Sequence, residues 1–395
     1  MQKDFHYYAA YCAAVLAGFT HEESLEIAYC DQFVDCCSGR LLSKINGPKS
    51  AATTQTQIEL ADANTDLLGL QDITRIWASF HFLPRDLYSP VKGCRAYKNK
   101  YRLICGPNGA LAEETVKLAK GRGTQAIGLA MHVLSDTWAH ANFAGTPSFV
   151  INNTDDYFYE ILPCGDGKIE ERHISLKNSP SSPDNADEGR YNGSIYQPNE
   201  TSIMNLGHGR AGHLPDYSFA RYRYMPAWGD YYEIVKDNPA DYYRAFAQMV
   251  YALKYLRGVI PEFRTDVYDY ETVGVYGEEI KRILEERTLI ACEGWKALGE
   301  KLSGCIIEDF DTEKYQEEYI NAGKAEKDST FLGQFIVAAM SQKSMVTNKI
   351  FSSGNTLAGL SVDYGKGGFR GIRDFRTLVE IYRKKEAQRG ESQKS

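Results

Sequence analysis

The chain has 395 residues, of which 43% are hydrophobic and 25% are charged, and its formal net charge at pH 7 is −7. This composition is typical of a globular protein with one large or two moderate domains. The acidic balance argues against a broad basic surface, so we expect no binding to duplex nucleic acid. The 9 cysteines are an odd number at irregular spacing, which favours reduced thiols over a disulfide framework.

No apolar run in the sequence approaches the roughly 20 residues that a transmembrane helix needs. The first residues, MQKDFHYYAA, also lack the basic and then apolar pattern of a secretory signal. We therefore expect no transmembrane segment, and a protein that is cytoplasmic or is exported without a classical signal peptide.

The start of the sequence predicts two helices. The first covers residues 4–19, with Asp4 as its N-cap. Thr20 and Glu23 form a capping box that starts a second helix, which we expect to reach residue 42.

A loop and two further helices follow. Residues 80–86 contain a proline and are expected to form a loop or a short element and not a long helix. The next helices are predicted near residues 110–122 and 124–143, with Gly123 between them and Gly145 as the stop signal.

Residues 146–205 change character, because they are rich in Asn, Ser, Pro and Gly. We expect a loop-rich insertion here, with a short hairpin near residues 168–176. Apolar residues at helical spacing return in residues 239–258 and again after residue 260. The fold is therefore predicted to be mainly α, with a loop-rich insertion, additional C-terminal helices and a frayed tail at residues 386–395.

The predicted helix near residues 124–143 combines an apolar surface with three polar groups. Between Gln125 and Phe143 the only formally charged side chain is Asp136, and His132 and His140 lie four residues to either side of it. A buried carboxylate is unfavourable unless hydrogen-bond donors or a cation compensate its charge. Hydrogen bonds in a polar core are one interpretation, but three such residues in register favour a metal.

The helical rise limits how these residues can bind metal. His132 and His140 are about 12 Å apart along the axis at roughly 1.5 Å per residue, so one ion each is expected. Asp136 lies between them and can bridge two ions, which indicates a multinuclear site.

The stretch NLGHGRAGHLPDY, residues 205–217, has poor helix propensity and few apolar residues, as ligand-bearing loops often do. It contributes His208, His213 and Asp216 as candidate ligands. Because His208 and His213 are five residues apart, they serve different ions or one of them supports a ligand from behind.

Four stretches, MQKDFHYYAAYCAAVLAG, IAYCDQFVD, HVLSDTWAHANFAG and GHGRAGHLPD, together resemble an uncharacterised bacterial protein family known by sequence only. The resemblance covers roughly residues 1–255. That family is in turn distantly similar to the zinc-dependent phospholipase C and single-strand-specific nuclease superfamily, mainly through an HxxxD motif in a central helix. This similarity implies a phospholipase C-like multi-helix bundle that holds three zinc ions.

Carried over by motif, the resemblance implies the ligands of a first ion. His132 and Asp136 match HxxxD, and His81 resembles the histidine that precedes that helix in the same site. Asp35 is our choice for the remaining carboxylate, with Asp31 as the alternative.

The resemblance implies two further ions. His6 resembles the N-terminal histidine of a second ion that shares Asp136, and His140 and His208 resemble ligands of a third. The secreted enzymes also use the amine of a processed N-terminus, for which we expect no processed counterpart here.

The third ion departs from the family pattern. The glutamate that the pattern places four residues after His208 is replaced by Gly212. His213 and Asp216 are the candidates to replace the missing carboxylate.

These residues together predict a metal-dependent hydrolase, most simply a phosphoesterase in which a metal-activated water attacks the substrate and Asp35 and Asp136 act catalytically. Zinc, as two or three ions, is the first choice, and Mn, Fe or Ni suit similar ligands. The expected substrates are a small molecule, a phospholipid or single-stranded nucleic acid. The alternatives are a metallohydrolase of a carbonyl substrate and a binding or effector (toxin) protein whose metals only hold the helices together.

The predicted organisation follows from where the ligands fall. All of the candidate ligands precede residue 260, so residues 1–260 are expected to form the metal-binding helical domain. Residues 261–385 are expected to form a C-terminal helical extension that packs on it.

Overall fold

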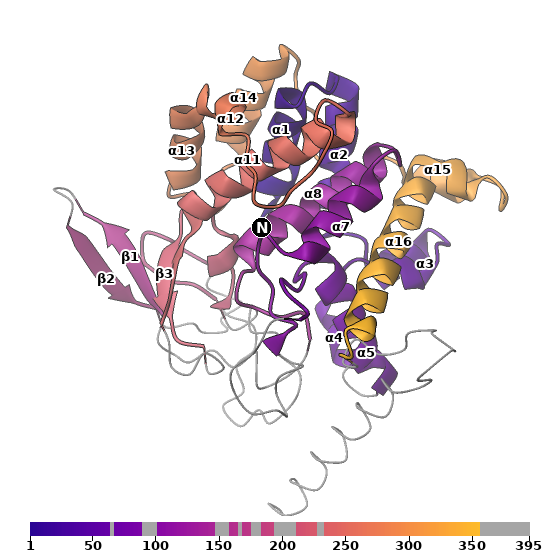
Figure 1. Ribbon diagram of the computed structural model, residues 1–395, viewed down its shortest axis with the longest axis horizontal. Helices are drawn as coiled ribbons and strands as arrows, with labels where there is room; N and C mark the ends of the chain where they lie inside the picture. Colours follow the sequence, from indigo (N-terminus) through magenta and orange to yellow (C-terminus); the bar gives the residue numbers. More distant parts are fainter. Residues whose placement is uncertain are drawn as a thin grey trace, which may run out of the picture.

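The computed structural model describes residues 1–63, 67–88, 101–146, 158–164, 168–174, 183–192, 211–226 and 233–355. Helices dominate these ranges, and a small antiparallel sheet lies at one side of the helical body (Figure 1). The mainly α prediction is therefore confirmed. The predicted tail at residues 386–395 and the ligand candidate His208 lie outside the described residues.

The helices follow one another in a simple order along the chain. They are the π-helical turn η1 (Asp4–Ala9), α1 (Ala10–Leu16), α2 (His21–Phe33), α3 (Gly39–Lys44), α4 (Gln57–Ala63), α5 (Leu67–Phe80), α7 (Ala110–Ala119), α8 (Thr124–Ala139), α11 (Asn238–Arg257), α12 (Tyr270–Gly274), α13 (Gly277–Glu285), α14 (Cys292–Ser303), α15 (Gln316–Asn321) and α16 (Phe331–Ser352). None of the helices in the described ranges is long and apolar enough to span a membrane.

Helix α8 lies at the centre of the bundle. Every residue from Gln125 to Ala139 is buried, and α2, α7, α11 and α16 pack around it (Figure 1). Gly128 allows α2 to pack closely on α8, because a Cβ atom at this position would lie 2.3 Å from the carbonyl oxygen of Ile27. The absence of a side chain at Gly128 thus brings the C-terminal part of α2, which carries Asp31, next to the polar residues of α8.

The helices after residue 260 complete the same core. Trp295 of α14 is fully buried and packs edge-on against Phe5, with ring centroids 5.9 Å apart. Asp4 does not cap the first helix as the sequence predicts. Instead, its carboxylate accepts hydrogen bonds from the backbone N–H of Phe5 at 2.9 Å and of Ala291 at 2.8 Å. The C-terminal helices therefore hold the N-terminal turn in place.

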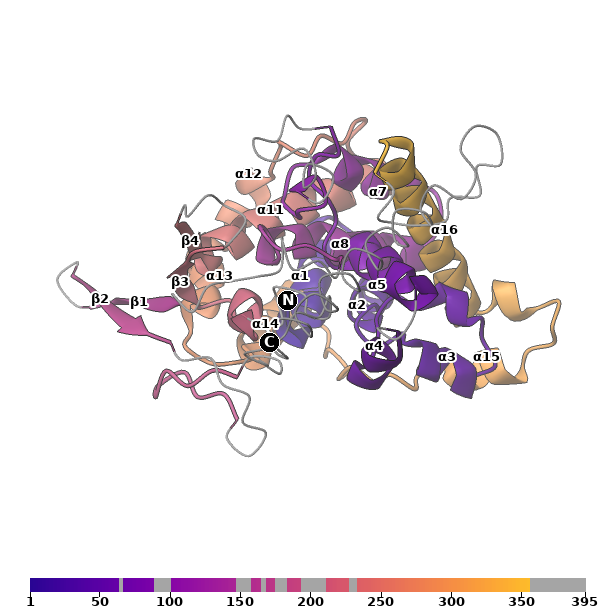
Figure 2. The same cartoon turned by 90° about the horizontal axis from the view of Figure 1, so that it is seen from below.

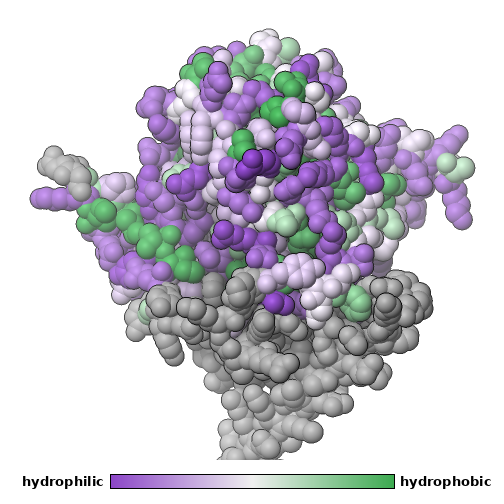
Figure 3. Space-filling view, viewed as in Figure 1, coloured by the Kyte–Doolittle hydropathy of each residue, from purple (hydrophilic) through white to green (hydrophobic). Residues whose placement is uncertain are grey.

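The sheet has four antiparallel strands, in the order β2-β1-β3-β4. The strands are β1 (Tyr159–Pro163), β2 (Ile169–His173), β3 (Arg221–Tyr224) and β4 (Ile234–Asp237). The hairpin expected near residues 168–176 lies earlier in the chain: its strands are β1 and β2, with Ile161 facing Glu171, so the predicted range contains only its second strand. The sequence did not predict β3 and β4, which follow the expected loop-rich insertion at residues 146–205. Figures 1 and 2 show the sheet beside the helices, and Figure 3 shows apolar side chains along this side, where Ile169 is 68% exposed.

The second helix is shorter than predicted, and this affects the site. The capping box of Thr20 and Glu23 is present, but α2 ends at Phe33 instead of continuing to residue 42. The hydroxyl of Thr53 donates to the carbonyl oxygen of Val34 at 2.6 Å, so a buried partner satisfies a carbonyl at the helix end. Asp35 consequently lies in a turn outside the helix.

The central helix also ends earlier than predicted, at Ala139, so that His140 caps it. Asn142 adopts a left-handed backbone conformation with φ of 76°, which turns the chain away from the helix axis. Gly145 is not the stop signal. It is needed for packing, because a Cβ atom there would lie 2.5 Å from the backbone nitrogen of Ala78.

Candidate metal centre

Asp136 lies in the middle of a buried polar cluster, and its two carboxylate oxygens face different partners. Oδ1 lies 2.9 Å from the Met1 amine and 3.2 Å from His6 Nε2. Oδ2 lies 3.2 Å from His81 Nδ1 and 3.2 Å from His132 Nε2. The Asp136 side chain is 1% exposed. Each oxygen is therefore the centre of its own group of buried donor atoms.

The group around Asp136 Oδ2 collects two imidazoles and a second carboxylate. Asp35 Oδ1 lies 3.8 Å from His81 Nδ1 and 3.8 Å from His132 Nε2. Ligand atoms of His81, His132 and Asp136 lie within 4.8 Å of one another. Asp35 comes from the turn after α2, and His81 follows the last residue of α5. Two imidazoles and two carboxylates at this spacing can surround one transition-metal ion.

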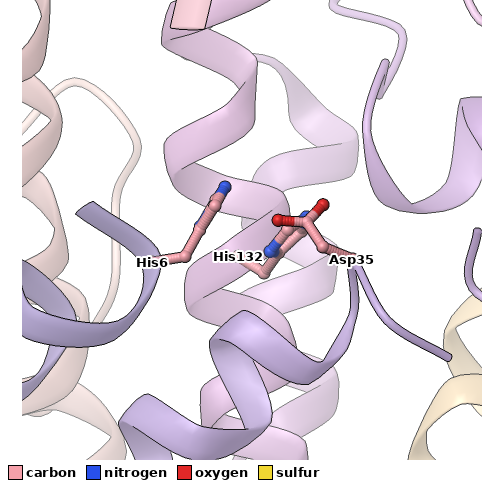
Figure 4. A group of neighbouring side chains, drawn as sticks. All are labelled: His6, Asp35 and His132. Atoms are coloured by element: carbon pink, nitrogen blue, oxygen red, sulfur yellow. The ribbon is translucent and has the colours of Figure 1, made fainter. Parts of the chain in front are cut away.

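The group around Asp136 Oδ1 contains His6 and the Met1 amine. His6 sits in the π-helical turn η1, a type of local geometry that is common at functional sites. Ligand atoms of His6, Asp35 and His132 also lie within 4.8 Å of one another. Figure 4 shows these three side chains pointing toward one another from separate segments. The two groups are thus neighbours and not independent sites.

Each of three imidazoles in the cluster has one nitrogen held by an oxygen atom. His6 Nδ1 lies 2.7 Å from Asp31 Oδ1, His81 Nε2 lies 3.0 Å from the carbonyl oxygen of Thr53, and His140 Nδ1 lies 2.7 Å from the carbonyl oxygen of His81. An oxygen acceptor keeps the proton on the nitrogen that it contacts. The lone pair of the other nitrogen then faces the interior, an arrangement that is usual for metal-binding histidines.

A third group of side chains adjoins the first two. His140 Nε2 lies 3.0 Å from Asp216 Oδ1, which also lies 3.1 Å from the Met1 amine. His213 Nδ1 lies 3.2 Å from Asp216 Oδ2, but the His213 side chain is 57% exposed. Asp216 therefore belongs to the buried cluster, and His213 lies at its rim.

Protons compensate the carboxylates in the metal-free protein. Burial opposes a charge on His132, but Asp136 and Asp35 together raise its pKa to about 10. Burial likewise opposes the charged Met1 amine, but Asp136 and Asp216 raise its pKa to about 11. Burial lowers the pKa of His81, which favours its neutral, ligating form. Both protonated groups would lose a proton if metal took over the compensation.

The donor set fits a metal ion. Buried polar atoms are normally hydrogen-bonded. His6 Nε2 nevertheless makes no hydrogen bond with any residue that the structure describes, although the His6 side chain is completely buried. Histidine nitrogens and carboxylate oxygens are ligands that zinc, manganese, iron and nickel all accept. The residues that can hold metal are His6, Asp35, His81, His132, Asp136, His140 and Asp216, together with the Met1 amine.

The structure separates the two acidic candidates at the end of α2. Asp35 Oδ1 faces the same space as His81 and His132, whereas Asp31 contacts the far nitrogen of His6. Of the two, Asp35 is therefore the one positioned to bind a metal ion together with His81 and His132. The sequence pattern contained both, because they are four residues apart at one helix end, but it did not distinguish their roles.

Several contributors to the centre were missed in the sequence. The carbonyl oxygen of Thr53 has no side-chain signal, and Gln32, whose amide Nε2 lies 3.3 Å from Asp35 Oδ2, resembles any other helical glutamine. No counterpart of the family's N-terminal amine was expected, yet the Met1 amine lies against Asp136 and Asp216. These contacts depend on tertiary packing that periodicity does not encode.

Residues 1–350 match a family of unknown function (DUF6765), and the chain belongs to this family. The match continues well past residue 255, so the C-terminal helices are part of the family and not an addition to it. No curated protein matches the chain, and no solved structure does.

Proposed function

We propose that the protein is a metal-dependent hydrolase of phosphoesters with a multinuclear centre bridged by Asp136. One observation carries this proposal: each oxygen of a single buried carboxylate faces a different set of nitrogen ligands. A bridging carboxylate between two ions is a common feature of hydrolytic metal centres that act on phosphoesters.

The candidate ligands can be assigned to two neighbouring ions and a third ion. His81, His132, Asp35 and Asp136 Oδ2 would hold the first, and His6, the Met1 amine and Asp136 Oδ1 the second. His140 and Asp216 would contribute to a third, together with His208 or His213. Zinc is our first choice, and Mn, Fe or Ni suit the same ligands. This division follows the ligand pattern that the resemblance to the zinc-dependent phospholipase C and single-strand-specific nuclease superfamily implies, and a phospholipase C-like fold is part of the same proposal.

The bound ions would supply a Lewis acid for the phosphoryl oxygen and a lowered pKa for the attacking water. Asp35 is the carboxylate that solvent reaches, because its side chain is 32% exposed whereas Asp136 is 1% exposed and Asp31 is fully buried. A carboxylate in this position can accept a proton from the water or orient it. Asp136 stays fixed, holding the two groups of imidazoles at constant spacing.

The same ligands suit two other functions. A carbonyl ester or amide is a possible substrate class, because the ligand types do not specify phosphorus. A binding or effector protein with purely structural metals would enclose every ligand, whereas Asp35 is partly exposed here. The exposure of Asp35 therefore favours an enzyme.

Metal analysis and a pair of chromogenic substrates test the proposal. Protein purified without chelator and reconstituted with Zn²⁺ or Mn²⁺ should contain at least two ions per chain by mass spectrometry. It should hydrolyse bis(p-nitrophenyl) phosphate much faster than p-nitrophenyl acetate, and a phospholipid and a single-stranded oligonucleotide then separate the phosphodiester classes. Faster hydrolysis of the acetate would favour a carbonyl substrate. Full metal content without turnover of any substrate would favour the structural role.

A further inference from the structure

Asp31 is a fully buried carboxylate that lies behind two candidate ligands at once. Its Oδ1 lies 2.7 Å from His6 Nδ1 and 3.3 Å from His132 Nδ1. The two imidazole rings stack on one another, with centroids 3.9 Å apart and planes 20° apart. Both rings therefore direct the same edge toward one carboxylate oxygen.

The opposite edges of these rings face different ions in the proposed centre. His6 Nε2 lies 3.2 Å from Asp136 Oδ1, and His132 Nε2 lies 3.2 Å from Asp136 Oδ2. One oxygen of Asp31 thus stands behind a ligand of each ion. Asp136 lies between the two proposed ion positions on the Nε2 side of the rings, and Asp31 lies near both rings on their Nδ1 side.

The buried position of Asp31 means that a negative charge on it requires compensation by the neighbouring imidazoles. Its side chain is fully buried, and its Oδ2 makes no hydrogen bond with any residue that the structure describes. A buried carboxylate in this condition is unfavourable unless positive charge lies nearby. His6 Nδ1 is hydrogen-bonded to Asp31, whereas His132 Nδ1 lies at ion-pair distance from the same oxygen and makes no hydrogen bond with a described residue. A carboxylate behind an imidazole makes it more basic and a better metal ligand, and metal binding in turn would leave positive charge on the ring.

We propose that Asp31 is a positioning residue that couples the two ions, because it fixes the orientation and donor strength of one imidazole ligand of each. The inference rests on the proposed metal centre and adds a linkage to it. Occupation of one position polarises its imidazole toward Asp31 and aligns the carboxylate for the second imidazole. Loss of the Asp31 charge then weakens both positions, although Asp31 itself contacts neither ion.

Titration of the full-length, metal-free protein with Co²⁺ tests this proposal, since the visible bands of Co²⁺ report its ligands. Asp31→Asn keeps the shape and removes the charge. We expect the affinity for both ions to fall about 10- to 100-fold, as is usual when the support of a ligand is lost. We also expect the bands at saturation to shift, because a neutral acceptor leaves both imidazoles less basic.

Asp4→Asn is the matched control for a merely structural effect. Asp4 is another buried carboxylate of the same core, but it accepts hydrogen bonds from backbone N–H groups. This variant should lose stability without a shift of the Co²⁺ bands. Asp31→Glu is the second variant, in case Asp31→Asn does not fold. It retains the charge and should bind both ions more tightly than Asp31→Asn and more weakly than the wild type.

The outcomes separate this inference from the metal centre itself. If wild-type protein binds two ions and the Asp31 variants bind both with wild-type affinity, or lose one and retain the other unchanged, the coupling is refuted and the centre stands. If wild-type protein binds no Co²⁺, the centre and the coupling are refuted together.

Discussion

His6 and His132 stack face to face in the core, with ring centroids 3.9 Å apart, although they come from the first turn of the chain and from the central helix. Two imidazoles in this arrangement would repel one another if both were charged. Their Nε2 atoms face the two oxygens of Asp136. In the proposed metal centre the two rings would be neutral ligands of adjacent ions, because bound metal would replace the proton that Asp136 and Asp35 otherwise keep on His132.

His81→Ala should remove one ion and leave the other groups in place. His81 lies on the Asp136 Oδ2 side, and its ring is anchored by the carbonyl oxygen of Thr53. We expect the metal content per chain to fall by one ion, measured by mass spectrometry after removal of loosely bound metal. His21→Ala is the control, because His21 contacts Tyr11 and lies outside the cluster. An unchanged metal content in His81→Ala would remove this residue from the centre.

Gln32→Met should weaken the centre through Asp35. The Gln32 amide lies 3.3 Å from Asp35 Oδ2, which leaves Oδ1 facing His81 and His132. Loss of this support should lower metal affinity about 10-fold or more, measured by chelator competition. Ser24→Ala, a buried change on the same helix, should bind metal as the wild type does. Equal affinity in both variants would show that Asp35 does not depend on Gln32.

Trp295→Ala should destabilise the whole protein and not only the C-terminal helices. The indole is fully buried, and its ring centroid lies 5.9 Å from Phe5 and 5.1 Å from Phe246. A cavity of this kind costs about 3–5 kcal/mol. Urea unfolding followed by circular dichroism should therefore show one transition at a lower midpoint. Two separate transitions would instead show that the C-terminal helices unfold independently of the site.

The sequence predicted those parts of the site that depend on local pattern. The central helix was identifiable because Asp136 is the one formally charged residue in an apolar stretch, and the capping box at Thr20 fixed the start of α2. The end of α2 was not predictable, because Thr53, distant in sequence, satisfies the carbonyl of Val34 at that point.

The remaining differences have the same physical origin. Strands β3 and β4 are four residues each, too short for an alternating pattern to stand out, and they are stabilised by pairing with β1 and with each other. Asp31 and Asp35 contact different neighbours because the chain leaves the helix between them. Tertiary contacts decide each of these features, so periodicity alone missed them.

Stability should depend on pH through Lys343 of α16. Burial lowers the pKa of this amine to about 8, while the unfolded chain keeps the ordinary value of 10.5. Between these two values the unfolded state binds more protons, so the contribution of Lys343 to stability rises with pH over this range. Below about pH 8, where the buried amine is charged, Lys343 lowers the free energy of unfolding by its full amount.

Lys343→Met removes this penalty and also the hydrogen bond from Nζ to the carbonyl oxygen of Ala52. We expect a net gain of about 1–2 kcal/mol at pH 7, which disappears as the pH approaches 10.5. Urea unfolding at a series of pH values measures this. Lys349→Met, an exposed change on the same helix, should show no such trend. A gain that does not change with pH would contradict the assignment to the charge of Lys343.

The most direct test of the bridged metal centre is Asp136→Asn, compared with Ser135→Ala beside it. Asparagine keeps the shape and the hydrogen-bonding capacity of the side chain but loses the negative charge that two ions would share. Ser135 is buried on the same helix, and its hydroxyl donates to the carbonyl oxygen of His132, so this variant controls for disturbance of α8. The measurement is metal per chain together with hydrolysis of a chromogenic phosphodiester, on folded protein of each variant. The account predicts that Asp136→Asn loses metal and activity together and that Ser135→Ala keeps most of both. Wild-type metal content and activity in Asp136→Asn would contradict it.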